Sequence, residues 1–136
     1  MVFKKKDAEQ ALINGYAEAE ETLNDTDKLE AFLQKLEQKL KTVPMVGETM
    51  SHVPAMVSLL RSYAKKEYTN IPMKSIVAIT SALIYLVSPV DLIPDNIPVI
   101  GYIDDAAVIK FCWLLVESDV EEYNDWRISM GKMKEN

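Results

Sequence analysis

The segment from residue 85 to residue 105, YLVSPVDLIPDNIPVIGYIDD, constrains the fold of this chain more than any other part of the sequence. It places three prolines, one glycine and four aspartates between two strongly apolar segments. Because proline lacks a backbone donor and stops a helix, the segment predicts a corner between two helices. The corner is itself apolar, and a carboxylate held among apolar side chains must be capped, paired, metal-bound or solvated. The segment is therefore a candidate functional site, although its residue types do not indicate a particular reaction.

One interpretation gives each unusual residue of this corner a local structural role. The run from Ser88 to Asp91 has the form of a helix start, with serine at the cap and proline at the first helical position. Asp95 can satisfy backbone donors in a turn, and Gly101 can supply a positive φ. The corner would then set the angle between its two flanking helices. The residues of this structural motif are Tyr85, Ser88, Pro89, Asp91, Pro94, Asp95, Pro98, Gly101, Asp104 and Asp105.

The second interpretation is that the aspartates of the corner converge on a metal ion. Mg²⁺ and Ca²⁺ are bound by several carboxylate oxygens, but the pattern lacks the spacing and the bidentate glutamate of a calcium-binding hand. Carboxylates that crowd together without a metal would raise the pKa of at least one of them. No catalytic residue and no organic cofactor is assigned. The candidate metal ligands are Asp91, Asp95, Asp104 and Asp105.

The order and spacing of these residues resemble the signature of the YkvA-like family, written YxxSPxDLIPDxIPxxGxxDD from Tyr85 to Asp105. The resemblance covers roughly residues 71–116, less than half of the chain. It implies a small helical domain, still classed as a domain of unknown function. It also implies a membrane connection, because some relatives lie within membrane-anchored proteins. The family supplies no established catalytic residues to carry over.

Helical periodicity predicts an N-terminal hairpin over about residues 7–41. A first helix is expected from Asp7 to Leu23. A second follows from Asp27 to Lys41, where Asp27 and Glu30 have the spacing of a capping box. The hairpin could be a partner-binding arm, but packing on the rest of the domain is the favoured interpretation. Its apolar positions are Ala8, Ala11, Leu12, Tyr16, Ala19, Leu23, Leu29, Phe32, Leu33, Leu36 and Leu40.

Three further helices are expected. A third helix follows residues 42–47 in two pieces, with Pro54 in the first turn of the second piece. A fourth, over residues 72–87, is apolar almost all round, which favours the centre of a bundle over contact with lipid. Its uncharged run is also shorter than the ~20 residues that span a membrane. A fifth helix begins at Asp104 or Asp105 and continues to about Met130. Its apolar first half, residues 106–116, is expected to be covered over most of its circumference.

Charge and composition argue against several classes of function. A net charge of −6 and a pI near 4.8 do not suit a nucleic-acid binder, which needs a basic surface. Cys112 is the only cysteine, so no intrachain disulfide can form, and its apolar neighbours predict a buried thiol. His52, the only histidine, is interpreted as a cap or surface residue. No secretory signal is expected, which predicts a cytoplasmic location, with peripheral contact at the inner membrane surface as an extension.

These patterns predict one all-α domain over residues 1–136. It is a compact bundle of about five helices with an N-terminal hairpin and the proline- and aspartate-rich corner between the last two helices. The predicted function is a non-enzymatic interaction module that acts through an unknown protein partner, self-association or a membrane surface, because its apolar helix surface exceeds what a short chain covers easily. The basic start at Lys4–Lys6 would add about 3 kcal/mol at an anionic membrane. The alternative is a divalent-metal-dependent enzyme that uses the four aspartates on a small or phosphorylated substrate.

Overall fold

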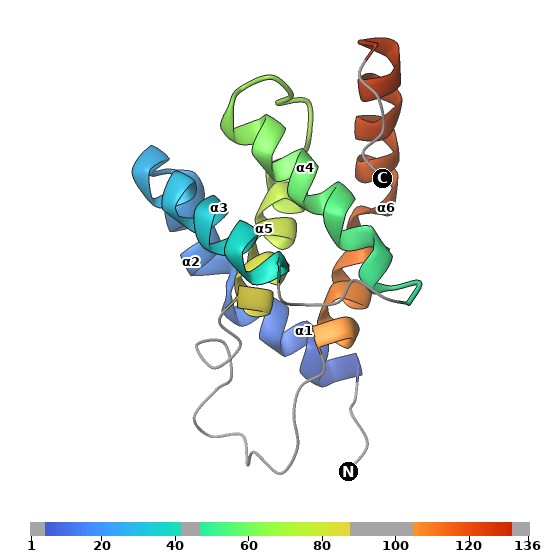
Figure 1. Ribbon diagram of the computed structural model, residues 1–136. Coiled ribbons are helices and arrows are strands. Elements are labelled where there is room, and N and C mark those ends of the chain that lie inside the picture. Colours follow the sequence, from blue (N-terminus) through green and yellow to red (C-terminus); the bar gives the residue numbers. More distant parts are fainter. Residues whose placement is uncertain (1–4, 42–46, 88–104, 132–136) are drawn as a thin grey trace.

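The computed structural model describes residues 5–41, 47–87 and 105–131, and this part of the chain is helical without any strand. The all-α prediction is confirmed. The helices pack around one another as a bundle (Figure 1). In chain order the elements are α1 (Lys5–Asn14), α2 (Tyr16–Leu23), α3 (Thr26–Leu40), the 3-10 turn η1 (Met50–His52), α4 (Val53–Ala64), α5 (Met73–Val87) and α6 (Asp105–Ser129).

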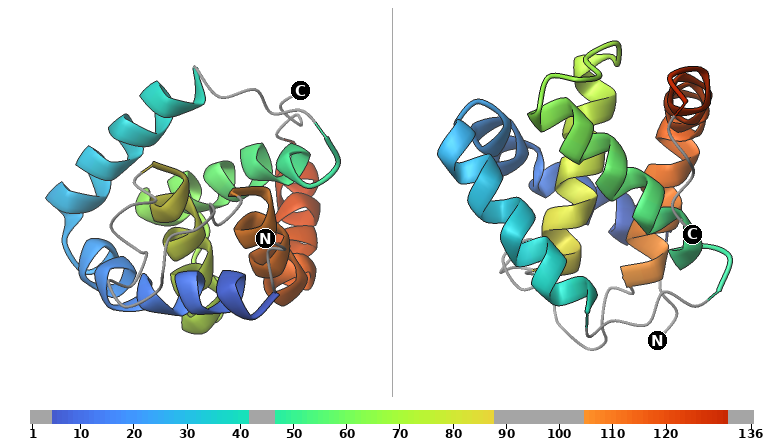
Figure 2. Two further views of the ribbon diagram at one scale, coloured as in Figure 1. Left: turned by 90° about the horizontal axis from the view of Figure 1, so that it is seen from below. Right: turned by 45° about the horizontal axis from the view of Figure 1, so that its top comes forward.

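Helix α5 is the centre of the bundle. Every residue from Ser75 to Leu86 is buried, so the helix is covered on all sides, as its apolar sequence predicted. Helices α1 and α2 cover one side of it, α3 and α4 cover the opposite side, and α6 runs along an edge (Figure 2). The buried serine and threonine hydroxyls of α5 are hydrogen-bonded. The Thr80 hydroxyl donates to the carbonyl of Ile76 at 2.8 Å, one turn earlier.

The predicted first helix is divided at Gly15 into α1 and α2, so the expectation of one continuous helix over residues 7–23 was wrong. The break falls at a glycine, which disfavours a helix interior, and a hydrogen bond from another helix lies beside it. The buried Ser81 hydroxyl of α5 donates to the carbonyl of Leu12 at 2.5 Å, and the Gly15 N–H donates to the same carbonyl at 3.1 Å. The change of direction lets α1 pack on α5 and α6 while α2 packs on α5 and α3. The apolar face predicted for this segment is buried at Ala8, Ala11, Leu12 and Ala19 and half-buried at Tyr16 and Leu23.

The α2–α3 hairpin is confirmed, but its cap differs from the predicted one. Asp25 is the N-cap of α3, and its carboxylate accepts hydrogen bonds from the backbone N–H groups of Asp27 (3.0 Å) and Lys28 (3.2 Å). The capping box proposed for Asp27 and Glu30 was therefore wrong. Asp27 instead lies in the first turn of α3, where its negative charge favours the helix dipole.

Helix α6 is the longest of the described elements, and its two halves have different surroundings. Its 25 residues extend over about 37 Å at 1.5 Å per residue, and its second half projects past the neighbouring helices (Figure 1). The buried hydroxyl of Tyr123 holds this half to α4, at 2.8 Å from the Ser62 hydroxyl and 2.7 Å from the Ser58 hydroxyl. Ser75 of α5 donates to the carboxylate of Asp119 at 2.5 Å. Helix α6 is therefore fixed by hydrogen bonds on two sides.

Candidate functional site

Most of the residues predicted to form a site lie outside the described part of the chain. This holds for the candidate metal ligands Asp91, Asp95 and Asp104. Asp105 is the first residue of α6, but its side chain is not described, so the metal site stays a prediction. Tyr85 is buried near the end of α5. The other structural-motif residues, Ser88, Pro89, Pro94, Pro98 and Gly101, also lie outside the described ranges.

Within residues 5–41, 47–87 and 105–131, no three His, Cys, Asp or Glu side chains come together in a group that could hold a metal ion. The two residues whose chemistry is most often catalytic are engaged otherwise. The Cys112 thiol is fully buried and donates to the Ala78 carbonyl at 3.4 Å, and burial raises the pKa of this thiol. The thiol is therefore protonated at neutral pH and a poor nucleophile. The His52 ring stacks on Trp113 with 3.7 Å between ring centroids.

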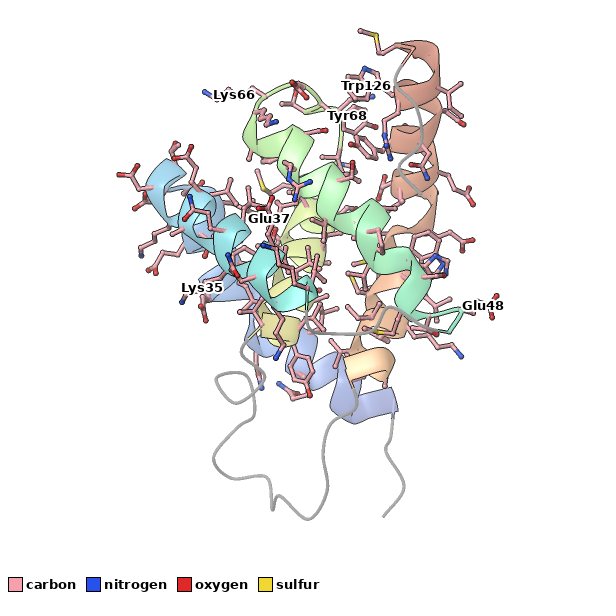
Figure 3. The ribbon with its side chains drawn as sticks, in the orientation of Figure 1. Lys35, Glu37, Glu48, Lys66, Tyr68 and Trp126 are labelled. Atoms are coloured by element: carbon pink, nitrogen blue, oxygen red, sulfur yellow. The ribbon has the colours of Figure 1, made fainter. Side chains whose placement is uncertain are left out.

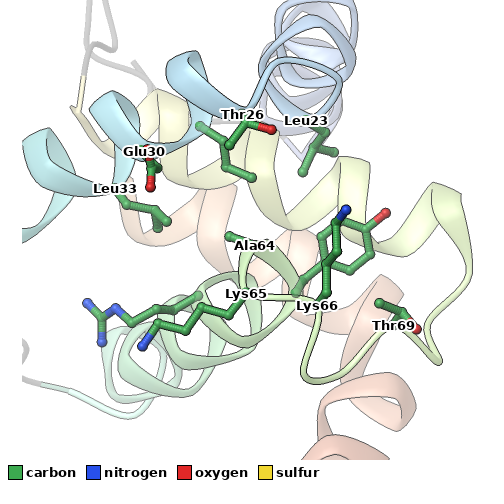
Figure 4. A pocket seen from close by; sticks show the side chains of 11 residues that line it. Leu23, Thr26, Glu30, Leu33, Ala64, Lys65, Lys66 and Thr69 are labelled. Carbon is green, nitrogen blue, oxygen red and sulfur yellow. The ribbon is translucent and has the colours of Figure 1, made fainter.

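A cavity that the sequence analysis did not anticipate lies between α3 and the C-terminal end of α4 (Figure 4). Its volume is about 530 Å³, within the range of small-molecule sites. Leu29 on one wall is buried, and the apolar side chains around it are half-buried. The residues that line the cavity are Leu23, Thr26, Leu29, Glu30, Leu33, Arg61, Tyr63, Ala64, Lys65, Lys66 and Thr69.

The rim of this cavity is basic, in contrast to the acidic chain as a whole. Three cations, Arg61, Lys65 and Lys66, face one carboxylate, Glu30. Arg61 is engaged, because its guanidinium lies 2.7 Å from the carboxylate of Glu37 on α3. The two lysines form no ion pair with any described residue. They leave a local excess of positive charge beside an apolar wall.

The backbone at Lys66 is unusual. Helix α4 ends in a Schellman motif, in which the Lys66 N–H donates to the Tyr63 carbonyl (3.0 Å) and the Glu67 N–H donates to the Ser62 carbonyl (2.9 Å). This motif requires a left-handed residue, a position that glycine takes at least cost. Lys66 occupies it with φ of 61°, the one non-glycine residue with positive φ in the described ranges. A lysine with a left-handed backbone therefore lies at the edge of the cavity.

The outer face of α6 departs from its prediction in the first half of the helix. Leu114 and Leu115 are 59% and 52% exposed, so the expectation that this half is mostly covered was wrong at these two positions. Phe111 beside them is half-buried, and Lys110, one turn before Leu114, is exposed. Neighbouring helices contact the opposite face of α6, which leaves the two leucines directed outward.

The second half of the same helix has a different surface. Four exposed acids, Glu117, Glu121, Glu122 and Asp125, follow the two leucines within three turns. Tyr68 and Trp126 pack together where α6 leaves the bundle (Figure 3), with 5.1 Å between their ring centroids. Helix α6 therefore exposes an apolar patch in its first half and an acidic surface in its second half.

The fold and these surfaces define a small all-α protein, and its described residues form no group of side chains that could hold a metal ion. Residues 75–111 match the family described as "Protein of unknown function (DUF1232)". The chain is also similar to the "Uncharacterized membrane protein YkvA" of Bacillus subtilis (strain 168), with 34% identity over 79 residues, which cover 58% of this chain and 74% of that protein. The chain belongs to this YkvA-like, DUF1232 family.

No solved structure matches the chain. The relative from Bacillus subtilis carries the word "membrane" in its name. Among the helices of the described part of this chain, none combines the length and the apolar content that crossing a membrane requires.

Proposed function

We propose that this protein is a non-enzymatic interaction module that attaches to a membrane surface through the outer face of the first half of α6. The observation that carries the proposal is the adjacent pair Leu114 and Leu115, more than half exposed in a protein whose other large apolar side chains mostly form a closed core. Exposed apolar side chains grouped on one helix favour an interface over isolated surface positions. The membrane is favoured over a protein partner because the similar Bacillus subtilis protein is named as a membrane protein.

The size of this patch fits weak, reversible attachment. Transfer of the exposed parts of Leu114 and Leu115 out of water would contribute about 3 kcal/mol together. Lys110, which is exposed beside them, would add about 1 kcal/mol at an anionic surface. The predicted contribution of Lys4–Lys6 would strengthen this attraction, although their side chains are not described. Such a total corresponds to peripheral binding and is far below that of a spanning helix.

The acidic second half of α6 constrains how the protein would lie on the membrane. Glu121 and Asp125 follow Leu114 at spacings that place them on the same outer face of the helix. An anionic membrane would attract the first half of this face and repel the second half. We therefore expect α6 to meet the membrane at a tilt, with its N-terminal half nearest to the lipid.

Flotation of the protein with vesicles in a density gradient tests this proposal. Vesicles of phosphatidylcholine and phosphatidylglycerol should carry the wild-type protein upward, and the double variant Leu114→Gln/Leu115→Gln should stay at the bottom. The matched control is Ile128→Gln/Met130→Gln, which removes two apolar side chains of similar exposure near the far end of α6. The control should float like the wild type. A wild-type protein that does not float but sediments as a dimer lost in L114Q/L115Q would replace the membrane with self-association.

The alternative of a divalent-metal-dependent enzyme rests on Asp91, Asp95, Asp104 and Asp105 and stays a prediction. It is tested by calorimetric titration of Mg²⁺ and Ca²⁺ into the wild type and into the variant Asp91→Asn/Asp104→Asn. Binding that is lost in a folded variant would support the metal site. A variant that unfolds whether or not metal is added would support the structural interpretation of the corner.

A further inference from the structure

We propose that the cavity between α3 and α4 binds a small anionic amphiphile, a single apolar chain with one negatively charged head group. The chain would lie against Leu29 and Leu33, and the head group would be held by Lys66 at the rim. This site is separate from the outer face of α6, so it does not depend on attachment to a membrane.

The shape of the cavity suits a chain with a head group. Leu23, Leu29 and Leu33 bring apolar surface from the α2–α3 hairpin, and Ala64 lies opposite them on α4. In Figure 4 Ala64 lies between Leu33 and Lys66, and the side chain of Lys66 extends toward Leu23. An apolar wall with one charged edge excludes water from a hydrocarbon chain while the edge keeps the head group solvated.

Charge complementarity favours an anion over a neutral or a cationic ligand. The acidic residues of this chain outnumber its basic ones, 21 to 15, yet three of the four charged residues that line the cavity are basic. Because Glu37 already neutralises Arg61, the remaining charged residues of the lining are Lys65 and Lys66 against Glu30, which leaves one net positive charge for a ligand. Inorganic phosphate has no apolar part to contact the leucines, and a neutral alcohol has no charge to pair with the lysines.

The conformation of Lys66 is a second, independent observation. A left-handed residue other than glycine is strained, and such strain concentrates where a side chain is needed at a fixed place. Glycine would complete the Schellman motif at less cost but would carry no charge. A cation at the end of a helix also interacts favourably with the helix dipole, but Lys65 in the preceding position already supplies that interaction.

Isothermal titration of the full chain with dodecanoate, kept below its micelle concentration, tests the site. We expect saturable binding of one molecule per chain. Dodecanol should bind at least about tenfold more weakly, because it has the same chain without the charge. Inorganic phosphate should show no saturation over the same concentrations. Dodecyl phosphate should bind like dodecanoate, since the proposal requires an anionic head group and not one particular anion.

Three variants locate the binding. Ala64→Phe fills the cavity and should abolish it. Lys66→Gly removes the ammonium and suits the left-handed backbone, so it should fold and bind about fivefold more weakly. Lys35→Gln is the matched control, because Lys35 is exposed on α3 and lies outside the cavity lining (Figure 3); it should bind like the wild type. Circular dichroism checks that each variant is folded.

Two kinds of result would overturn the assignment. One is saturable binding that Ala64→Phe leaves unchanged, or that L114Q/L115Q abolishes, because the ligand would then lie on another surface. The other is equal affinity for dodecanol and dodecanoate, or the absence of saturable binding. Apart from a loss of binding in L114Q/L115Q, which would place the ligand on the outer face of α6, these results leave the flotation experiment unaffected, so the cavity and the membrane surface are tested separately.

Discussion

Helix α5 at the centre of the molecule and the first half of α6 at its edge have similar sequences but different surroundings. Helix α5 and the first half of α6 are both almost wholly apolar. Helix α5 is buried all round because five helices contact it, whereas α6 lies at an edge and leaves Leu114 and Leu115 exposed. The cavity between α3 and α4 is a second place where apolar side chains remain partly open to solvent. The comparison shows that apolar composition selects residues for burial, but the number of neighbouring helices decides which of them are buried.

The strongest test of this contrast replaces one leucine in each region. Leu83→Ala in α5 removes a fully buried side chain and should lower the free energy of unfolding by about 3 kcal/mol, because it leaves a cavity. Leu114→Ala in α6 should change it by less than about 0.5 kcal/mol. Urea denaturation followed by circular dichroism measures both values. Equal losses in the two variants would mean that α6 is covered in solution, by a second copy or by chain outside the described ranges.

A second test concerns the hydrogen bonds that hold the second half of α6 to α4. Tyr123→Phe removes the hydroxyl that meets Ser58 and Ser62, and the Ser62 side chain is then left buried without this partner. We expect the free energy of unfolding to fall by about 2 kcal/mol. Tyr63→Phe is the control, since the Tyr63 side chain is half-buried at the cavity, and it should change stability by less than about 0.5 kcal/mol. An unchanged stability in Tyr123→Phe would contradict the importance of this contact.

The buried face of α6 can be tested through pH. Burial raises the pKa of Cys112 above that of an unfolded thiol, which is about 8.5. As the pH rises above this value, the unfolded chain loses the thiol proton first, so the folded state becomes less stable. The thiol's part of this loss should approach about 1.4 kcal/mol per pH unit by about pH 9.5, where tyrosines of the unfolded chain, with a pKa of about 10, begin to add to the measured slope. Urea denaturation at several pH values measures the slope.

Cys112→Ala is the control for that experiment. The variant should be less stable at every pH, since it removes buried volume, but it should lack the thiol's part of the slope. A slope that is the same in both proteins would mean that Cys112 titrates normally and that this face of α6 is open to water.

The sequence predicted what depends on local pattern. The apolar run of α5, the two-part third helix with Pro54 in the first turn of α4, and the buried thiol of Cys112 were all predicted correctly. Each of these features follows from periodicity, backbone chemistry or immediate neighbours, which a single sequence records. The N-cap of α3 was harder, because Asp25 and Asp27 are chemically equivalent candidates two residues apart.

The sequence could not predict what depends on segments far apart in the chain. The hydrogen bond that accompanies the break at Gly15 joins Ser81 to Leu12, 69 residues away in the chain. The exposure of Leu114 depends on which helices lie beside α6, and the cavity combines residues 23–33 with residues 61–69. A local signal for the cavity did exist, because Lys65 and Lys66 follow an apolar helix as a pair, but the pair is also typical of an ordinary helix end.

The smallest expected effect is an increase in stability, and it concerns the C-terminal end of α4. Lys66→Gly places glycine at the left-handed residue of the Schellman motif, which relieves the strain of a side chain at φ of 61°. The greater freedom of glycine in the unfolded chain offsets part of this gain, so we expect stability to rise by about 0.5 kcal/mol. The control is Lys65→Gly, one residue earlier, where the backbone is right-handed and glycine should destabilise the protein. A rise in stability together with weaker binding of dodecanoate would show that Lys66 is kept for its charge at the expense of stability. A fall in stability would mean that the Lys66 side chain makes contacts that outweigh its strain, and the strain would then no longer support a ligand site at the cavity.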